Sequence, residues 1–250
     1  MGITFEQTPE MFGILHIGLL IIIALISVIF FMAFRNRNEK TLIRMIGVMG
    51  IIMVIGEIWK QWFVPRYVYT DGPSTWFFPW QLCSMAMYCS LLLPYLKGKT
   101  QNTVLVFLAT YSLLSAFIAL LIPADMMRLQ IWLFCHGFLY HAIMILECLA
   151  AILILRQRSR TPFYPAVILF SVMAVIAEII NVISHHIIND THVEANMFYI
   201  TPYYPTTQPV FHQIAVALGI LPGIIIYLAA ITIGSYLLYW MENKFSGKDN

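Results

Sequence analysis

Long runs of apolar residues, separated by short polar or Gly/Pro-containing segments, constrain this chain more than any other feature. A helix needs about 20 mainly apolar residues to cross the hydrocarbon core of a bilayer. Seven runs have roughly this length, at about residues 11–34, 42–63, 79–96, 103–122, 131–155, 163–187 and 211–240. We therefore predict an all-α membrane bundle of seven transmembrane helices, forming a single domain over residues 1–250.

The composition agrees with a membrane location for these runs. Hydrophobic residues make up 60% of the chain and charged residues only 10%, whereas about a quarter of the residues in a soluble domain are charged. The formal net charge is only +2 and the basic residues are dispersed, which argues against a nucleic-acid-binding surface. All four cysteines lie inside apolar runs, so no disulfide framework is expected. We expect an integral, multi-pass membrane protein, located in the cell membrane if its host is bacterial.

The positions of lysine and arginine predict the orientation of the bundle, because short cytoplasmic loops collect basic residues. Eleven of the fourteen basic residues fall on one side of the predicted crossings, namely Arg35, Arg37, Lys40, Arg44, Lys97, Lys99, Arg156, Arg158, Arg160, Lys244 and Lys248. The other side has only Lys60, Arg66 and Arg128. We therefore predict that the N-terminus lies outside the cytoplasm and the C-terminus inside.

The last apolar run is longer than a crossing requires. It contains Gly219, Pro222 and Gly223 in close succession, and such residues interrupt or bend a helix. We predict that this run is tilted or broken over 211–240, with the stretch 219–223 supplying the residues for a kink.

Polar side chains within the predicted helices gather toward the outer side of the membrane, where each requires a partner, a cavity or a function. Residues three, four and seven positions apart share one face of a helix. Two helices have a polar stripe of this kind, composed of Glu178, Asn181 and His185 on one and of His136, Tyr140 and Glu147 on the other. If the stripes face each other, they line an outward-facing cavity. The candidate substrate-binding residues are Gln81, Tyr140, Glu178, Asn181 and His185.

Glu57 and Lys60 form a separate pair of charges on the run 42–63. They are three residues apart, so they share a helix face and are expected to form an ion pair. Such pairing neutralises two charges within the membrane and stabilises the bundle without requiring a chemical role.

Cys83 and His136 form a candidate catalytic pair. Each lies about one turn inside the outer end of its predicted helix, so the two are expected at similar depth. In covalent acyl transfer, imidazole accepts the thiol proton, the thiolate attacks an ester carbonyl, and imidazolium protonates the leaving alkoxide. A lone cysteine in a membrane helix is more often a small packing residue, so depth alone does not establish catalysis.

Three short motifs carry a resemblance to a known family. They are Pro79-Trp80-Gln81-Leu82-Cys83, the His136 position near the start of the run 131–155, and Asn196-Met197-Phe198-Tyr199-Ile200 followed by Pro202. In order and separation they resemble the YwaF-like integral membrane family, which is related to the transmembrane protein 164 acyltransferases. The resemblance covers nearly the whole chain.

The resemblance implies transfer of fatty acyl groups among phospholipids, with Cys83 as nucleophile and His136 as base. It also implies that Asn196 orients the imidazole or donates to the oxyanion. Gln81 stands where the family pattern has a histidine, so a proton carried by that histidine in relatives would need another carrier here, such as His141 or His185. The implied partners are a phospholipid or lysophospholipid and the surrounding lipids, with no cofactor and no metal.

Two other classes of function remain open from the sequence. A metal-dependent lipid hydrolase would use histidines such as His136, His185 and His186 around zinc, although no His-x-x-x-His spacing is present. A transporter or receptor would use the polar stripes to bind a solute or carry protons. A thioester would itself partition between a lipid hydroxyl and water, according to how dry the cavity is.

Overall fold

The computed structural model describes residues 3–69, 75–187 and 194–247. Its α-helices are α1 (Ile14–Phe34), α2 (Glu39–Tyr67), α3 (Leu82–Leu92), α4 (Gly98–Phe107), α5 (Leu113–Leu121), α6 (Ile131–Arg156), α7 (Tyr164–Ile187), α8 (Phe211–Leu218) and α9 (Ile220–Phe245). The 3-10 helices are η1 (Leu93–Tyr95) and η3 (Met197–Tyr199), and η2 (Leu108–Ser112) is π-helical. Within these residues the only β pairing is an isolated bridge between Thr4 and Gln130, so the predicted all-α class is confirmed.

Six helices in the described part of the chain are long and apolar enough to cross a membrane. They are α1, α2, the continuous unit of α4, η2 and α5 over Gly98–Leu121, α6, α7 and α9. Of these helices, α1 is the least buried by the rest of the protein. Only 6% of its most apolar 18-residue stretch is buried. An integral, multi-pass membrane protein follows from these six helices.

The third predicted crossing is shorter than expected. The predicted run began at residue 79, but Gln81 has an extended backbone and caps α3, which contains 11 residues. η1 adds 3 more, and the two together rise roughly 22 Å, which is less than the roughly 30 Å of a bilayer core. The helical part of this segment therefore does not meet the length criterion for a crossing.

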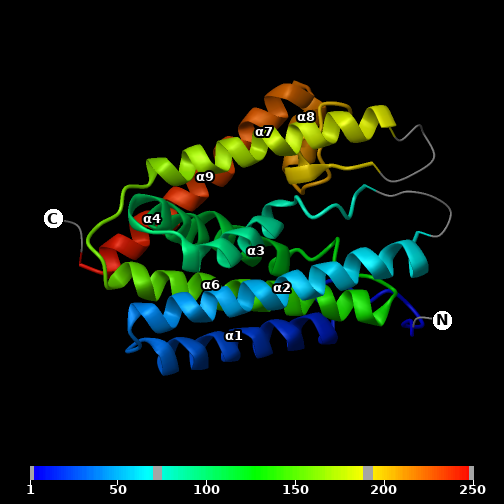
Figure 1. The fold of residues 1–250 in the computed structure, drawn as a ribbon. Helices are drawn as coiled ribbons and strands as arrows, with labels where there is room; N and C mark the ends of the chain where they lie inside the picture. The colour runs from blue at the N-terminus through cyan, green and yellow to red at the C-terminus, as the bar shows by residue number, and fades with distance from the viewer. Residues whose placement is uncertain (1–2, 70–74, 188–193, 248–250) are drawn as a thin grey trace.

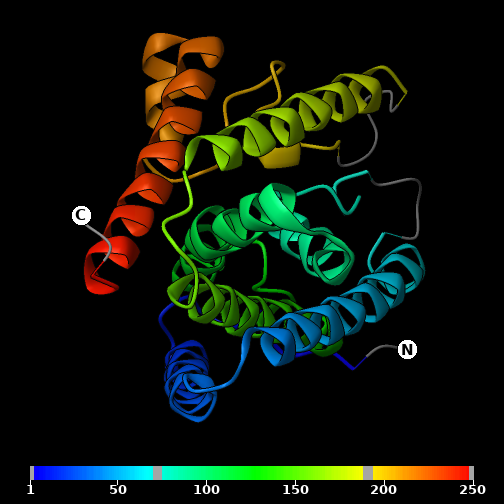
Figure 2. The same ribbon diagram turned by 60° about the vertical axis from the view of Figure 1, so that its left-hand side comes forward.

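The last apolar run forms two helices, so the break expected within 211–240 is present and lies at Gly219. Gly219 separates α8 from α9 with φ 98°, a conformation that L side chains rarely adopt. A Cβ on Gly223 would lie 2.8 Å from the Ala215 Cα, so α8 packs closely against the start of α9. Figure 2 shows α8 lying beside α9 at the edge of the bundle.

The packing centres on α6, which contacts α1, α2, α5, η2 and α4. α2 also packs on α3, where a Cβ at Gly50 would lie 2.7 Å from the Leu91 backbone nitrogen. A glycine at the contact allows two helices in a membrane bundle to approach this closely. α7 packs on α4 and on η3.

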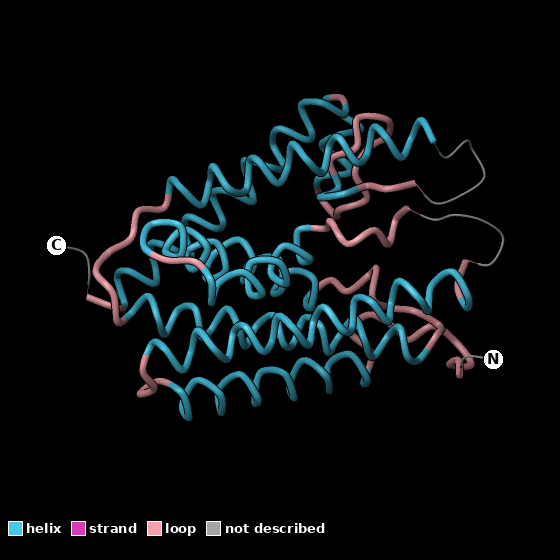
Figure 3. Tube along the Cα trace, in the orientation of Figure 1, coloured by secondary structure: helices cyan, strands magenta, loops and turns pink. Residues whose placement is uncertain are grey.

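The described chain starts and finishes at opposite ends of the bundle (Figure 1). Figure 3 shows the loops gathered at these two ends. The segments 3–13, 75–81, 122–130 and 194–210 lie at the end where the chain starts. Of these segments, 75–81, 122–130 and 194–210 contribute residues to the candidate site.

Candidate functional site

A cavity of about 590 Å³ opens between the helices at the end where the chain starts. Its walls come from α2, α3, α5, α6, η3, α8 and α9, and from the loops before α3, α6 and α8. Most of the lining side chains are apolar, and the charged ones are Glu57, Lys60, Asp125 and Arg128. The volume lies in the range of cavities that hold small organic ligands, roughly 300–1,000 Å³.

Cys83 lines this cavity from the first turn of α3 and is partly buried. The preceding segment is held by the hydroxyl of Tyr88, which donates to the Pro79 carbonyl at 2.9 Å. The thiol is free. The start of α3 therefore presents a cysteine to an enclosed, mainly apolar space.

His136 lines the same cavity from α6 and packs against α2. Its ring lies 5.6 Å from the Trp59 ring and 5.7 Å from the Tyr140 ring, measured between centroids. Its Nε2 is buried and has no hydrogen-bond partner among the residues that the structure describes. A Cβ at Gly56 would lie 3.3 Å from this atom, so Gly56 leaves the space that the imidazole occupies.

The cavity brings Cys83, His136, Gln81 and Tyr140 together. Tyr140 is 6% exposed, and its hydroxyl has no partner in the described part of the chain. No hydrogen bond joins the Cys83 thiol to His136 within the described residues. The pair therefore shares a cavity without the direct contact of a working catalytic hydrogen bond.

The side chain of Gln81 joins α3 to the loop that follows α7. Its Nε2 donates to the Asn196 carbonyl at 3.1 Å, and its Oε1 accepts from the Phe198 backbone N–H at 3.0 Å. Gln81 thus uses both ends of its amide on one loop.

Asn196 holds the same loop from within, and Asn181 holds it from α7. Asn196 is fully buried, and its Oδ1 accepts from the Thr201 N–H at 3.0 Å. The Asn181 side chain accepts from the Met197 N–H at 2.6 Å and donates to the Met197 carbonyl at 3.2 Å. Neither asparagine is among the residues lining the described cavity. Both fix the backbone of η3.

The held loop presents Tyr199 to the cavity. Phe198 and Tyr199 have φ of 56° and 59°, which non-glycine residues adopt only when the surroundings impose it. The Tyr199 hydroxyl donates to Asp125. Burial raises the pKa of Tyr199, and the Asp125 carboxylate raises it further, so the phenol stays a neutral donor.

The expected ion pair is present, with the Lys60 Nζ 2.9 Å from the Glu57 Oε2. The Gln61 Nε2 donates to the other Glu57 oxygen at 2.7 Å and to the Phe77 carbonyl at 2.5 Å. Both Glu57 and Lys60 line the cavity. Their pairing limits the cost of two charges at this depth.

Glu178 and His185 lie apart from the cavity lining, on α7. The Glu178 Oε2 accepts from the Asn181 Nδ2 at 3.4 Å. The His185 Nδ1 is 3.1 Å from both carboxylate oxygens of Glu194, and its ring stacks on Tyr203 at 3.5 Å between centroids. This stripe is engaged with the loop beyond α7.

Sequence reasoning did not single out Tyr199, Asp125 and Arg128 as cavity residues. Tyr199 lies inside the third motif, but the positive φ that directs it has no signature in its residue type. Asp125 and Arg128 lie in a loop, whose path is not set by helical periodicity. His141 was named as a substitute proton carrier; it also lines the cavity, and its Nδ1 donates to the Gly137 carbonyl at 2.8 Å.

Metal ions in proteins are commonly bound by clusters of histidine, cysteine and carboxylate side chains. Across residues 3–69, 75–187 and 194–247, no group of three or more of them could hold a metal ion.

The model of the TMEM164 family matches residues 11–241. No curated protein and no solved structure matches the chain.

Proposed function

The chain belongs to the TMEM164 family, and from this premise we propose that it is a membrane-embedded acyltransferase. In this proposal it moves fatty acyl groups on phospholipids through a thioester on Cys83. The observation that carries the proposal is that Cys83 and His136 line one mainly apolar cavity. Acyl transfer requires a free thiol and an available imidazole nitrogen. Cys83 is a free cysteine, and the His136 Nε2 has no hydrogen-bond partner among the described residues.

The proposed topology has seven crossings, with the N-terminus outside the cytoplasm. Six crossings are the long apolar helices, and the remaining one, third in chain order, is the whole segment 75–95. In this segment an extended stretch precedes α3 and η1. Non-helical backbone is tolerated at membrane depth where protein surrounds it. The basic residues support this orientation. The two ends of the described chain lie at opposite ends of the bundle (Figure 1), which supports an odd number of crossings. With this orientation the cavity faces the outer leaflet.

In the first half of the reaction, His136 removes the proton from the Cys83 thiol. The thiolate attacks the carbonyl carbon of a phospholipid ester, and the carbon–oxygen bond to the glycerol breaks. The imidazolium returns its proton to the departing oxygen, which leaves a lysophospholipid and an acyl thioester. Catalytic hydrogen bonds are often long in ligand-free proteins, so closure of the cavity on a lipid is expected to bring the two side chains together.

In the second half, His136 accepts the proton of a lysophospholipid hydroxyl. The resulting oxygen attacks the thioester carbonyl, the carbon–sulfur bond breaks, and the thiolate regains a proton from the imidazolium. Water competes with the lipid hydroxyl, and a dry cavity favours transfer over hydrolysis. Apolar side chains of α5 and α9, such as Ile118 and Ile231, supply the wall that excludes water.

Gln81, Asn181 and Asn196 act by holding the Tyr199 loop against the cavity. In the proposed site Tyr199 and Tyr140 contact the lipid, because both line the cavity. Glu178 and His185 support this wall from α7 through Asn181 and Glu194.

The experiment that tests this proposal uses purified protein in nanodiscs with a phospholipid that carries a labelled acyl chain. We expect label to move to added lysophospholipid, and we expect mass spectrometry to find a hydroxylamine-sensitive acyl group on the Cys83 peptide. Cys83→Ala should abolish both. Cys135→Ala is the matched control, because Cys135 is exposed and does not line the cavity.

Two outcomes would contradict the proposal. Transfer that persists in Cys83→Ala and stops with a chelator would instead support metal chemistry. If the wild-type protein leaves the label in place, the transporter or receptor alternative becomes the better account.

A further inference from the structure

Two basic side chains line the cavity close to one aromatic ring. The Lys60 Nζ lies 6.0 Å from the centroid of Phe77, and the Arg128 Cζ lies 5.4 Å from the same centroid. Lys60 comes from α2 and Arg128 from the loop before α6. Two elements that are distant in sequence thus bring their positive charges to one part of the wall.

Most of the hydrogen-bonding capacity of these two side chains is unused by the residues that the structure describes. The Lys60 ammonium contacts one oxygen of Glu57 at 2.9 Å, and an ammonium has three donors. The Arg128 Nε donates to the Asp125 carbonyl at 2.8 Å. Arg128 forms no ion pair with the residues that the structure describes, and its terminal nitrogens have no hydrogen-bond partner among them.

The neighbouring carboxylates are already engaged. Glu57 accepts from Lys60 and Gln61, and Asp125 accepts from the Tyr199 hydroxyl. An external anion therefore has donors available at Arg128 and Lys60 without displacing a bond seen in the structure. A phosphodiester suits such a pair, because its oxygens accept from a guanidinium fork and an ammonium together.

We propose that Lys60 and Arg128 form a subsite for the phosphodiester of a lipid substrate, beside the Phe77 ring. This proposal deepens the acyltransferase function and rests on it for the identity of the lipid. The subsite lies in the same cavity as Cys83, so it would hold the headgroup while the acyl ester reaches the thiol. The remaining apolar wall accommodates the acyl chain.

Binding is measured on the Cys83→Ala protein in detergent micelles, because this variant cannot turn the lipid over. The probes are a lysophosphatidylcholine, a monoacylglycerol with the same acyl chain, and inorganic phosphate. Arg128→Gln removes one charge. The double variant Glu57→Gln with Lys60→Gln removes the other without leaving a carboxylate unpaired. Arg66→Gln is the matched control, since Arg66 donates to the Trp62 carbonyl at 3.0 Å and does not line the cavity.

We expect Arg128→Gln and the double variant each to weaken lysophosphatidylcholine binding about tenfold, the effect of losing one charge-assisted contact. Binding of monoacylglycerol should stay unchanged, and Arg66→Gln should affect neither lipid. Equal weakening of both lipids, or no weakening of either, would overturn the subsite. Displacement of the lysolipid by an equal concentration of inorganic phosphate would overturn the lipid assignment in favour of a free anion.

Failure of the subsite and failure of the proposed function are distinguishable. Selective binding of the phosphate-containing lipid with no acyl transfer by the wild-type protein retains the subsite and rejects the acyltransferase. Acyl transfer through Cys83 with no selectivity for the phosphate-containing lipid retains the acyltransferase and rejects the subsite.

Discussion

The Gln81 side chain donates to the Asn196 carbonyl at 3.1 Å, across a separation of 115 residues in sequence. It also accepts from the Phe198 N–H at 3.0 Å. This bridge connects the start of the helix that presents Cys83 to the loop that presents Tyr199. The first and third sequence motifs are therefore two halves of one structural unit.

The bridge can be tested by changing the chemistry of position 81. Gln81→Glu keeps the acceptor for Phe198 but loses the donor to Asn196, and Gln81→Ala loses both. We expect losses of about 1 kcal/mol of unfolding free energy for the first variant and about 2 for the second, with a parallel fall in acyl transfer. Thermal unfolding in detergent ranks the variants by their stability. Gln213→Ala on the exposed face of α8 is the control, and an equal effect there would refute a specific bridge.

Gly56 provides a test of the His136 position. A Cβ here would lie 3.3 Å from Nε2, so Gly56→Ala should shift the imidazole by a few tenths of an ångström. We expect roughly a tenfold loss of transfer rate, since catalytic geometry tolerates little displacement. The unfolding temperature should not fall, because alanine favours a helix over glycine by about 0.5–1 kcal/mol. Gly18→Ala is the control, as a Cβ there meets nothing within 4 Å. An unchanged rate in Gly56→Ala would argue against His136 as the base.

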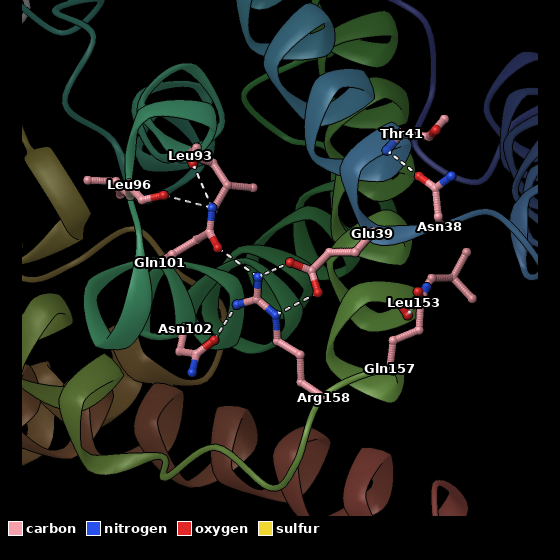
Figure 4. A network of polar contacts seen from close by, with 10 residues as sticks. All are labelled: Asn38, Glu39, Thr41, Leu93, Leu96, Gln101, Asn102, Leu153, Gln157 and Arg158. Carbon is pink, nitrogen blue, oxygen red and sulfur yellow. Dashed lines mark hydrogen bonds and ion pairs between the residues drawn. The ribbon is translucent and has the colours of Figure 1, made fainter.

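Arg158 should stabilise the end of the bundle that lies away from the cavity. Figure 4 shows the network of polar contacts that it forms there. Its guanidinium donates to Glu39 at the start of α2, and to Gln101 and Asn102 on α4. The pair is partly exposed, with Arg158 at 17% and Glu39 at 37%, and exposure weakens such contacts. We therefore expect Arg158→Ala to cost about 1–2 kcal/mol of stability.

Arg158→Lys should restore little of this stability, because an ammonium cannot form the planar fork. Transfer per folded molecule should be unchanged, because the cavity lies at the other end of the bundle. Chemical unfolding in detergent gives the stability, with exposed Lys99→Ala as the control. If Arg158→Ala and Lys99→Ala unfold alike, the network contributes nothing measurable.

The topology predicts which introduced cysteines are accessible from outside the cell. Gln7 and Ser159 are exposed. The segments that contain them, 3–13 and the connection between α6 and α7, lie at opposite ends of the described bundle (Figure 1). In a background where Cys83 and Cys135 are alanine, Gln7→Cys should react with an impermeant maleimide in intact cells. Ser159→Cys should react only after permeabilisation. Labelling of Ser159→Cys alone in intact cells would reverse the orientation.

The helices were largely predictable because hydropathy and side-chain pairing within a helix are local properties. The runs that gave α1, α2, α6 and α7 needed only consecutive residues, and the Glu57–Lys60 pair needed only its spacing of three. The positions of Cys83 and His136 in one cavity were partly predictable by the same reasoning. Depth along a helix follows from counting residues, whereas rotation about its axis does not.

The tertiary structure decided the features that depend on residues far apart in the chain. The hydropathy pattern does not distinguish one kinked helix from two helices separated at Gly219. The separation depends on the fit of Gly223 against Ala215. The positive φ at Tyr199 exists because its loop is held by Gln81 and Asn181, from two other helices. The sequence alone determined which segments become helices in a membrane. Packing determined which helix faces meet, because the free energy of that choice belongs to pairs of distant residues.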